Sequence, residues 1–203
     1  MFEFNELQSE ALKEILNMGA GRAAASLEAL IGEHFVLNVP SVSLLAADDL
    51  DDLHILDDSR RAIMLGVKGD LNGFTSMVFS MNSARQILAN TLDDEISLDE
   101  MDILTESTLM ELGNVVVGAI VGEFANQLQL GLQYSSPTLL EGSIKELATN
   151  GALGLNPQII VAKVSFTDST GQTEGYFMTI FDVGSMSLVL PAIDGYLEAQ
   201  GLL

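Results

Sequence analysis

One sparse pattern of two polar residues and a proline occurs twice in this chain, 97 positions apart. In each copy an asparagine follows a glutamate by three residues, and a proline follows the asparagine by 23 residues. The first copy consists of Glu14, Asn17 and Pro40, and the second of Glu111, Asn114 and Pro137. A repeated pattern at one fixed separation indicates an internal duplication. The chain is therefore expected to fold into two equivalent halves.

The first half begins with signals for a long helix. Asn5 and Gln8 form a capping-box signature, and Gly32 is the residue type that commonly ends a helix. A strand is predicted over 35–45, where Pro40 starts or bends it. Paired strands are predicted over 62–68 and 74–79, and a short helix from Asn82 to about residue 92.

The second half repeats this order. Ser97 and Glu100 form a capping-box signature for a helix to about residue 130. Strands are predicted over 133–140, 159–166 and 176–181, and a helix over 184–197 with a kink at Pro191. The hairpins also match between the halves, since Gly73-Phe74 aligns with Gly175-Tyr176 at a separation of 102.

Two copies of helix, strand, strand, strand and helix predict an α/β protein with pseudo-two-fold symmetry. Each half of about 100 residues would be marginal alone, whereas a shared sheet buries more apolar surface. We therefore expect one domain over 1–203, built from repeats at about 1–95 and 96–203. It should contain a mainly antiparallel six-stranded sheet flanked by helices, and the acidic stretch 93–102 is the candidate boundary.

Charge and composition exclude several classes of function. The net charge of −21 opposes binding to nucleic acid or to anionic membranes. It is typical either of a protein that attracts a basic partner or of an ordinary acidic surface. The absence of cysteine excludes disulfides and cysteine metal sites. The apolar run 115–121 is too short to span a bilayer, and the first residues lack the basic start of a signal peptide, so a soluble protein is expected.

The repeated polar residues are expected to form one stripe on each long helix, because positions i, i+4 and i+7 lie close together on a helix surface. These stripes consist of Glu10, Glu14 and Asn17, and of Ser107, Glu111 and Asn114. A carboxamide can orient a water molecule without changing its protonation state, and a carboxylate can pair with a cation on a partner. This combination favours the positioning of a hydrolytic water over covalent catalysis.

The pattern of Asp or Ser, then Glu, Asn and Pro, resembles that of the CheC/CheX/FliY family of chemotaxis phosphatases. The second copy matches it in full through Ser107, Glu111, Asn114 and Pro137, and the first through Glu14, Asn17 and Pro40. The first copy departs from it at Glu10. Two copies in a chain of 203 residues resemble the CheC type within this family.

The resemblance implies a CheC-like fold and a cytoplasmic enzyme that hydrolyses the aspartyl phosphate of a CheY-type response regulator. In that mechanism Asn17 and Asn114 orient the attacking water, and Glu14 and Glu111 pair with a lysine of the regulator. Mg²⁺ belongs to the regulator, and this chain binds no cofactor or metal. The receptor deamidase CheD is a further possible partner of such proteins.

Several alternatives stay open. A non-enzymatic module that binds a phosphorylated regulator or CheD is the competing hypothesis for function. Pro40 and Pro137 are interpreted as structural, and Glu10 and Ser107 as supporting residues. The acidic run from Asp48 to Asp58 could suggest a metal site, but it lacks the spacing and glycine of an EF-hand, so we interpret it as a solvated loop.

Overall fold

A computed structural model describes residues 3–32, 34, 36–46, 49, 60–80, 98–140, 158–167 and 172–203. The helices in these ranges are α1 (Glu6–Ile31), α3 (Leu98–Gln127) and α5 (Val183–Ala199). The strands are β1 (Val36–Ala46), β2 (Arg60–Gly69), β3 (Gly73–Ser80), β4 (Leu132–Tyr134), β5 (Thr138–Leu139), β6 (Gln158–Thr167) and β7 (Gln172–Phe181). The helix predicted from Asn82, the capping residue Ser97 and most of the acidic run 48–58 lie outside the described residues.

Helix α1 begins and ends as its sequence predicts. The Gln8 amide donates to Asn5 Oδ1 at 2.8 Å, and the Asn5 amide donates to Gln8 Oε1 at 3.0 Å, which completes the capping box. At the other end Gly32 adopts φ 81°, and its amide donates to the Glu28 carbonyl at 2.8 Å. Helix α5 continues through Pro191.

The strands form one sheet in the order β1-β6-β7-β3-β2-β4, with β5 also paired to β2, and the register in every pair is antiparallel. The prediction of a mainly antiparallel sheet is confirmed. The strand expected over 133–140 is wrong in one respect, because it is divided into β4 and β5. Pro137 has no amide hydrogen to donate, and Ser135 instead accepts the Gly66 amide on its hydroxyl at 3.0 Å. Within the described residues the sheet therefore contains seven strands, of which β4 and β5 both pair with β2 and together take the place of the sixth predicted strand.

The strand order has the symmetry of the duplication. From either edge inward come the first strand of one half, the second strand of the other half and a central third strand. The central strands β3 and β7 pair so that Ser76 lies opposite Met178, its equivalent at a separation of 102. Each half thus places its first strand at the edge beside the other half's second strand, so the two halves interlock in one sheet. The expected repeat boundary near residue 95 falls outside the described residues.

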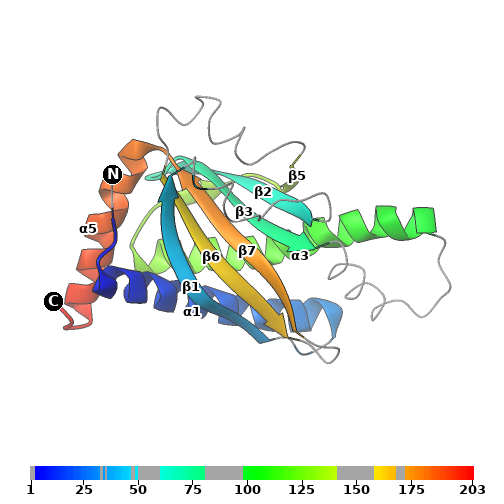
Figure 1. Cartoon of the computed structure of the whole chain (residues 1–203), viewed down its shortest axis with the longest axis horizontal. Helices are drawn as coiled ribbons and strands as arrows, with labels where there is room; N and C mark the ends of the chain where they lie inside the picture. Colours follow the sequence, from blue (N-terminus) through cyan, green and yellow to red (C-terminus); the bar gives the residue numbers. More distant parts are fainter. Residues whose placement is uncertain are drawn as a thin grey trace.

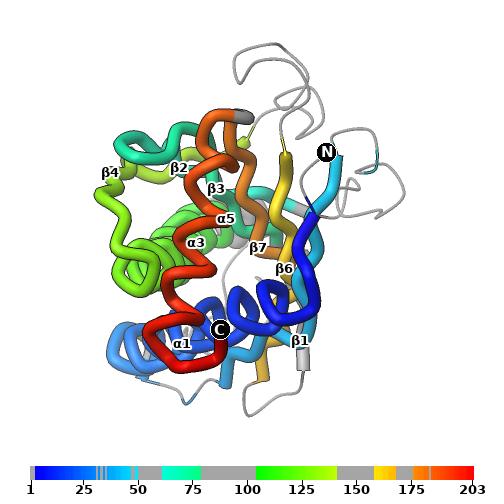
Figure 2. The backbone as a smooth tube through the Cα atoms, turned by 90° about the vertical axis from the view of Figure 1, so that its left-hand side faces the viewer, coloured from blue at the N-terminus to red at the C-terminus, as the bar shows by residue number. Residues whose placement is uncertain are grey.

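Helices α1 and α3 lie side by side along one face of the sheet, and α5 crosses at one end (Figures 1 and 2). The larger apolar core fills the space between these helices and the sheet. A smaller cluster occupies the opposite face, where Val78, Ile159 and Met178 are buried. The two long helices are therefore fixed by a core beneath them and present their outer surfaces to solvent.

Small residues allow α1, α3 and the sheet to approach closely. A Cβ atom on Gly19 would lie 2.7 Å from Ile120 Cα, and one on Gly113 would lie 2.6 Å from Ile63 Cβ. The same interface contains the buried carboxylate of Glu123. It pairs with Arg22 of α1 at 2.7 Å and accepts from Gln127 Nε2 at 2.6 Å. A carboxylate buried this deeply needs such partners to offset its desolvation.

Helix α3 contains a window, Leu104–Gln127, that is long and apolar enough to cross a membrane by length and composition alone. Half of that window is buried inside the protein. Its buried side chains include Leu109, Val116 and Ile120, which belong to the main core. Packing against α1 and the sheet therefore accounts for the apolar character of those side chains.

Candidate active sites on the two long helices

The structure places both predicted stripes on the outer surfaces of α1 and α3. Four of the side chains are exposed and the two asparagines are half-buried. The exposed residues are Glu10 and Glu14 on α1, and Ser107 and Glu111 on α3. Each asparagine is thus held by a rigid helix next to an exposed glutamate. This arrangement suits a group that must be aimed at a partner.

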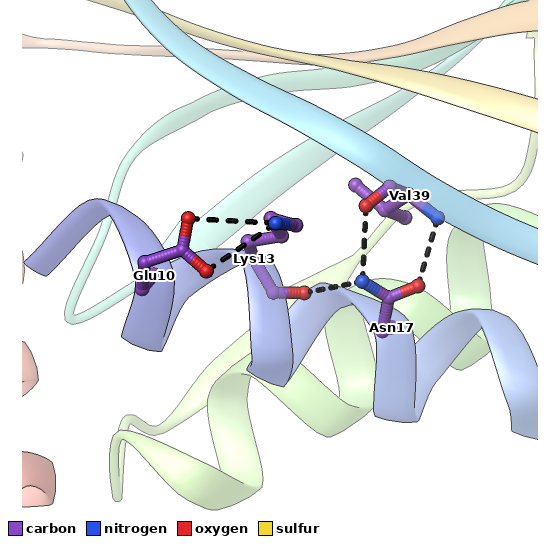
Figure 3. A network of polar contacts seen from close by, with 4 residues as sticks. All are labelled: Glu10, Lys13, Asn17 and Val39. Carbon is purple, nitrogen blue, oxygen red and sulfur yellow. Dashed lines mark hydrogen bonds and ion pairs between the residues drawn. The ribbon is translucent and has the colours of Figure 1, made fainter.

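In the first copy the carboxamide of Asn17 is bound to the edge strand β1 (Figure 3). Its Oδ1 accepts the Val39 amide at 2.8 Å, and its Nδ2 donates to the Val39 carbonyl at 3.0 Å. Nδ2 also donates to the Lys13 carbonyl at 2.9 Å. The whole polar edge of the side chain is therefore engaged with main chain.

The position of Pro40 explains why Val39 is available for this contact. The register between β1 and β6 shifts between Asn38 and Ser41, which indicates a β-bulge at Val39-Pro40. The main-chain groups of Val39 leave the ladder there and meet Asn17 instead. Pro40 is thus structural, as predicted. The contact itself was missed, although the equal separation of Asn and Pro in both copies was a signal that these positions are related.

The second copy differs from the first at this point. Asn114 has no hydrogen-bond partner among the residues that the structure describes. Ser136 stands where the first copy has Val39, and its carbonyl accepts the neighbouring Ser135 hydroxyl at 2.9 Å. The carboxamide of Asn114 is therefore available to a partner, whereas that of Asn17 must first leave Val39.

We expect this difference to appear in stability. Asn17→Ala removes three hydrogen bonds that join α1 to its own backbone and to β1. Because each intramolecular hydrogen bond contributes a net ~0.5–1.5 kcal/mol, the loss of all three should lower the free energy of unfolding by about 1.5–4.5 kcal/mol. Asn114→Ala should change it by less than about 0.5 kcal/mol. Urea unfolding of the two variants measures both values, and equal losses would contradict the contrast between the two copies.

The charge on the first stripe is partly neutralised. Lys13 Nζ lies 3.3 Å from Glu10 Oε2, so the carboxylate that departs from the family pattern has a cation beside it (Figure 3). The position equivalent to Lys13 on α3 is Met110. With Lys13 counted, each stripe carries one net negative charge. Exposed pairs of this kind contribute at most about 1 kcal/mol, so Glu10 alters the first site less than its charge suggests.

The first stripe borders an open groove of about 380 Å³ between α1 and the end of α5. The groove is lined by Leu7, Glu10, Ala11, Lys13, Glu14, Asn17, Leu197 and Leu202. Gln8 Nε2 donates to Asp194 Oδ1 at 2.7 Å and joins α1 to α5 beside it. Burial raises the pKa of the nearby Tyr196 hydroxyl, and the carboxylates of Glu14 and Glu123 raise it further. Tyr196 therefore stays neutral and does not act as a base near neutral pH.

Known proteins with similar sequences are chemotaxis phosphatases. A family model described as "Chemotaxis phosphatase CheX" matches residues 61–154, which include Glu111, Asn114 and Pro137. The chain is 27% identical to "CheY-P phosphatase CheC" of Bacillus subtilis (strain 168) over 176 residues, which are 83% of this chain and 84% of that protein. The chain is similar in sequence to CheC-type chemotaxis phosphatases over most of its length. The resemblance found in the motifs is thereby confirmed.

Solved structures agree with a CheC-type fold. FliY of Thermotoga maritima superposes with a TM-score of 0.74 at 14% identity, covering 97% of this chain and 99% of that one. The FliM middle domain from H. pylori superposes with a TM-score of 0.60 at 12% identity, covering 93% and 99%. At these identities the similarity concerns the fold, so the function of this chain depends on its site residues.

Proposed function

We propose that this chain accelerates hydrolysis of the aspartyl phosphate of a CheY-type response regulator in cytoplasmic chemotaxis signalling. The observation that carries the proposal is the duplicated stripe, in which an exposed glutamate precedes a half-buried asparagine by one helical turn on both α1 and α3. The relative in B. subtilis is named as a phosphatase of phosphorylated CheY, and the matching family model is named as a chemotaxis phosphatase.

The chemistry requires little from this chain beyond positioning. The oxygen of a water molecule attacks phosphorus, and the bond from phosphorus to the aspartyl oxygen breaks. The regulator's carboxylate leaves, and the water's proton passes to the released phosphate or to solvent. The carboxamide of Asn17 or Asn114 can accept a hydrogen bond from that water and donate one to a phosphoryl oxygen. The gain in rate comes from orientation.

The remaining partners are part of the same proposal. We assign Mg²⁺ to the regulator, where it neutralises the phosphoryl oxygens. Among the described residues of this chain no three His, Asp or Glu side chains are placed to hold a metal ion. CheD is a second proposed partner, and we expect no insertion into a membrane.

The direct test measures phosphate release from a radiolabelled phospho-regulator, with and without this protein, at saturating Mg²⁺. Acceleration that depends on protein concentration supports the phosphatase. Binding of the regulator without acceleration would instead favour the alternative, a non-enzymatic module. That alternative has one observation in its favour, because the Asn17 carboxamide is already engaged with Val39.

The two sites are expected to contribute unequally to the rate. Opening the first site breaks the two hydrogen bonds between Asn17 and Val39, whereas Asn114 has no such bonds among the described residues. At ~0.5–1.5 kcal/mol for each bond, this reduces the turnover at the first site by about fivefold or more. Asn114→Ala should therefore remove most of the stimulated rate and Asn17→Ala the smaller part. Single-turnover rates of the two variants test this, and equal losses would contradict it.

Glu14 and Glu111 are expected to act in docking more than in chemistry. Both are exposed, and a carboxylate that pairs with a cation on a partner contributes salt-sensitive binding. Changing both to Gln should raise KM about three- to tenfold while leaving kcat within about twofold. The salt dependence of KM should weaken as well. An unchanged KM with a collapsed kcat would assign these residues to the chemical step instead.

A further inference from the structure

An exposed leucine stands at the same place in both copies of the stripe. Leu7 and Leu104 are 97 residues apart, and each precedes the glutamate of its motif by seven residues. Their exposed fractions are 40% and 38%. Leu12 and Leu109 are also equivalent, but both are fully buried, so packing in the core accounts for them. It does not account for the exposed pair.

A glycine likewise stands at the same place on the far side of each asparagine. Gly21 and Gly118 follow Asn17 and Asn114 by four residues, in the interior of their helices. Glycine destabilises a helix interior relative to alanine, so a structural reason for it is expected. Yet a Cβ atom at either position would meet no atom within 4 Å. Packing among the described residues therefore gives no reason for a glycine at either position.

These residues extend the stripe already described. Leucine, glutamate, asparagine and glycine occupy relative positions 1, 8, 11 and 15 of the pattern, all on one side of the helix. Fourteen residues of helix span about 21 Å, which is the scale of a protein–protein contact. In the first copy Leu7 and Asn17 line the same groove. The leucines and glycines are therefore continuous with the proposed site.

We propose that the phosphorylated regulator docks along the whole of each stripe, from the leucine to the glycine. The leucine contacts an apolar side chain on the regulator beside its phosphorylation site. The missing side chain at the glycine lets the regulator's main chain approach the helix, which brings the asparagine within reach of the phosphoryl group. This inference rests on the proposed function. It adds two docking positions to each stripe, the leucine and the glycine, which the Glu/Asn pair alone does not predict.

The leucines are tested by the double variant Leu7→Gln with Leu104→Gln. Loss of a half-exposed leucine from an interface should raise both KM and the Kd for a BeF₃⁻-activated regulator about five- to tenfold, with kcat unchanged. The matched control is Leu30→Gln. Leu30 is 51% exposed on α1, and the equivalent residue on α3 is already Gln127. The control should keep the KM and Kd of the wild type.

The glycines are tested by Gly21→Ala with Gly118→Ala, for which stability and activity should move in opposite directions. The midpoint of thermal unfolding should rise, because alanine favours the helix and meets no atom. Meanwhile kcat/KM should fall about five- to tenfold. The matched control is Gly122→Ala, which also meets no atom and has Ala25 as its equivalent. It should raise the midpoint without changing kcat/KM.

The outcomes separate this inference from the proposed function. Wild-type protein that binds the activated regulator without accelerating phosphate release would overturn the phosphatase, and a leucine-dependent Kd would still support the docking stripe. Leucine and glycine variants that bind and turn over like the wild type, with an intact thermal transition, would overturn the docking stripe and leave the phosphatase in place.

Discussion

Replacing Asn17 and Asn114 together by alanine is expected to return the dephosphorylation rate of the regulator to its unassisted value. Each carboxamide can both accept from a water and donate to a phosphoryl oxygen, whereas the glutamate carboxylate beside it can only accept. The hydroxyl of Ser107 could also do both, but it lies seven residues before Asn114. With both asparagines removed, neither helix retains a side chain at that position to orient the water. Because orientation supplies the acceleration, little of it should remain.

This loss must be separated from a loss of fold. Asn17→Ala also removes the contact with Val39, so the assay belongs well below the unfolding transition of the double variant. Asn126→Ala is the matched control, since Asn126 is exposed on α3 outside the stripe. It should retain the wild-type rate. Full activity in a folded Asn17/Asn114 double variant would remove the water-positioning mechanism.

A second substitution at the same position tests which property of the carboxamide matters. Asn114→Asp keeps the shape of the side chain but replaces the donor with a negatively charged acceptor. It should be as inactive as Asn114→Ala, because a carboxylate repels the phosphoryl oxygens. Retention of activity in the aspartate variant would indicate that only the acceptor is needed.

Gly73→Ala should produce the largest change in stability. Gly73 begins β3, and a Cβ atom there would lie 2.0 Å from the carbonyl oxygen of Ile180 and 3.1 Å from Phe181 Cα. Both atoms belong to the main chain of β7, so no side-chain rotation can relieve the clash. Overpacking costs ~1–3 kcal/mol when side chains can adjust, and we expect about 3 kcal/mol or more here.

The consequence extends beyond one turn because β3 and β7 are the central pair that joins the two halves of the sheet. For a chain of this size a loss of ~3 kcal/mol lowers Tm by roughly 6–12 °C, which thermal unfolding measures directly. Gly195→Ala is the control, since its Cβ would meet no atom on α5 and the variant should be as stable as the wild type or more so. A Tm for Gly73→Ala within about 2 °C of the wild type would show that β7 can move away from β3.

Much of the architecture follows from local signals. Asn5, Gln8 and Gly32 determine the two ends of α1, because caps satisfy main-chain groups within a few residues of the cap itself. The alternation of apolar residues and the turn between β2 and β3 predict that hairpin for the same reason. The duplicated stripe was visible because a helix brings residues seven apart onto one side without help from the rest of the fold.

The sequence by itself therefore determined the two ends of α1, the strand hairpins and the motif on each long helix, since each depends on residues close together in the chain. The duplication was visible because the same motif recurs at a fixed separation. Only the tertiary structure decided that the two halves interlock in one sheet and that the strand around Pro137 is divided. It also decided that Asn17 binds Val39, whereas Asn114 has no hydrogen-bond partner among the described residues. The exposure of Leu7 and Leu104 was likewise decided by which face of each helix the core covers. These features depend on contacts between segments that are more than 20 residues apart in the sequence. A local pattern of residue types does not specify such contacts.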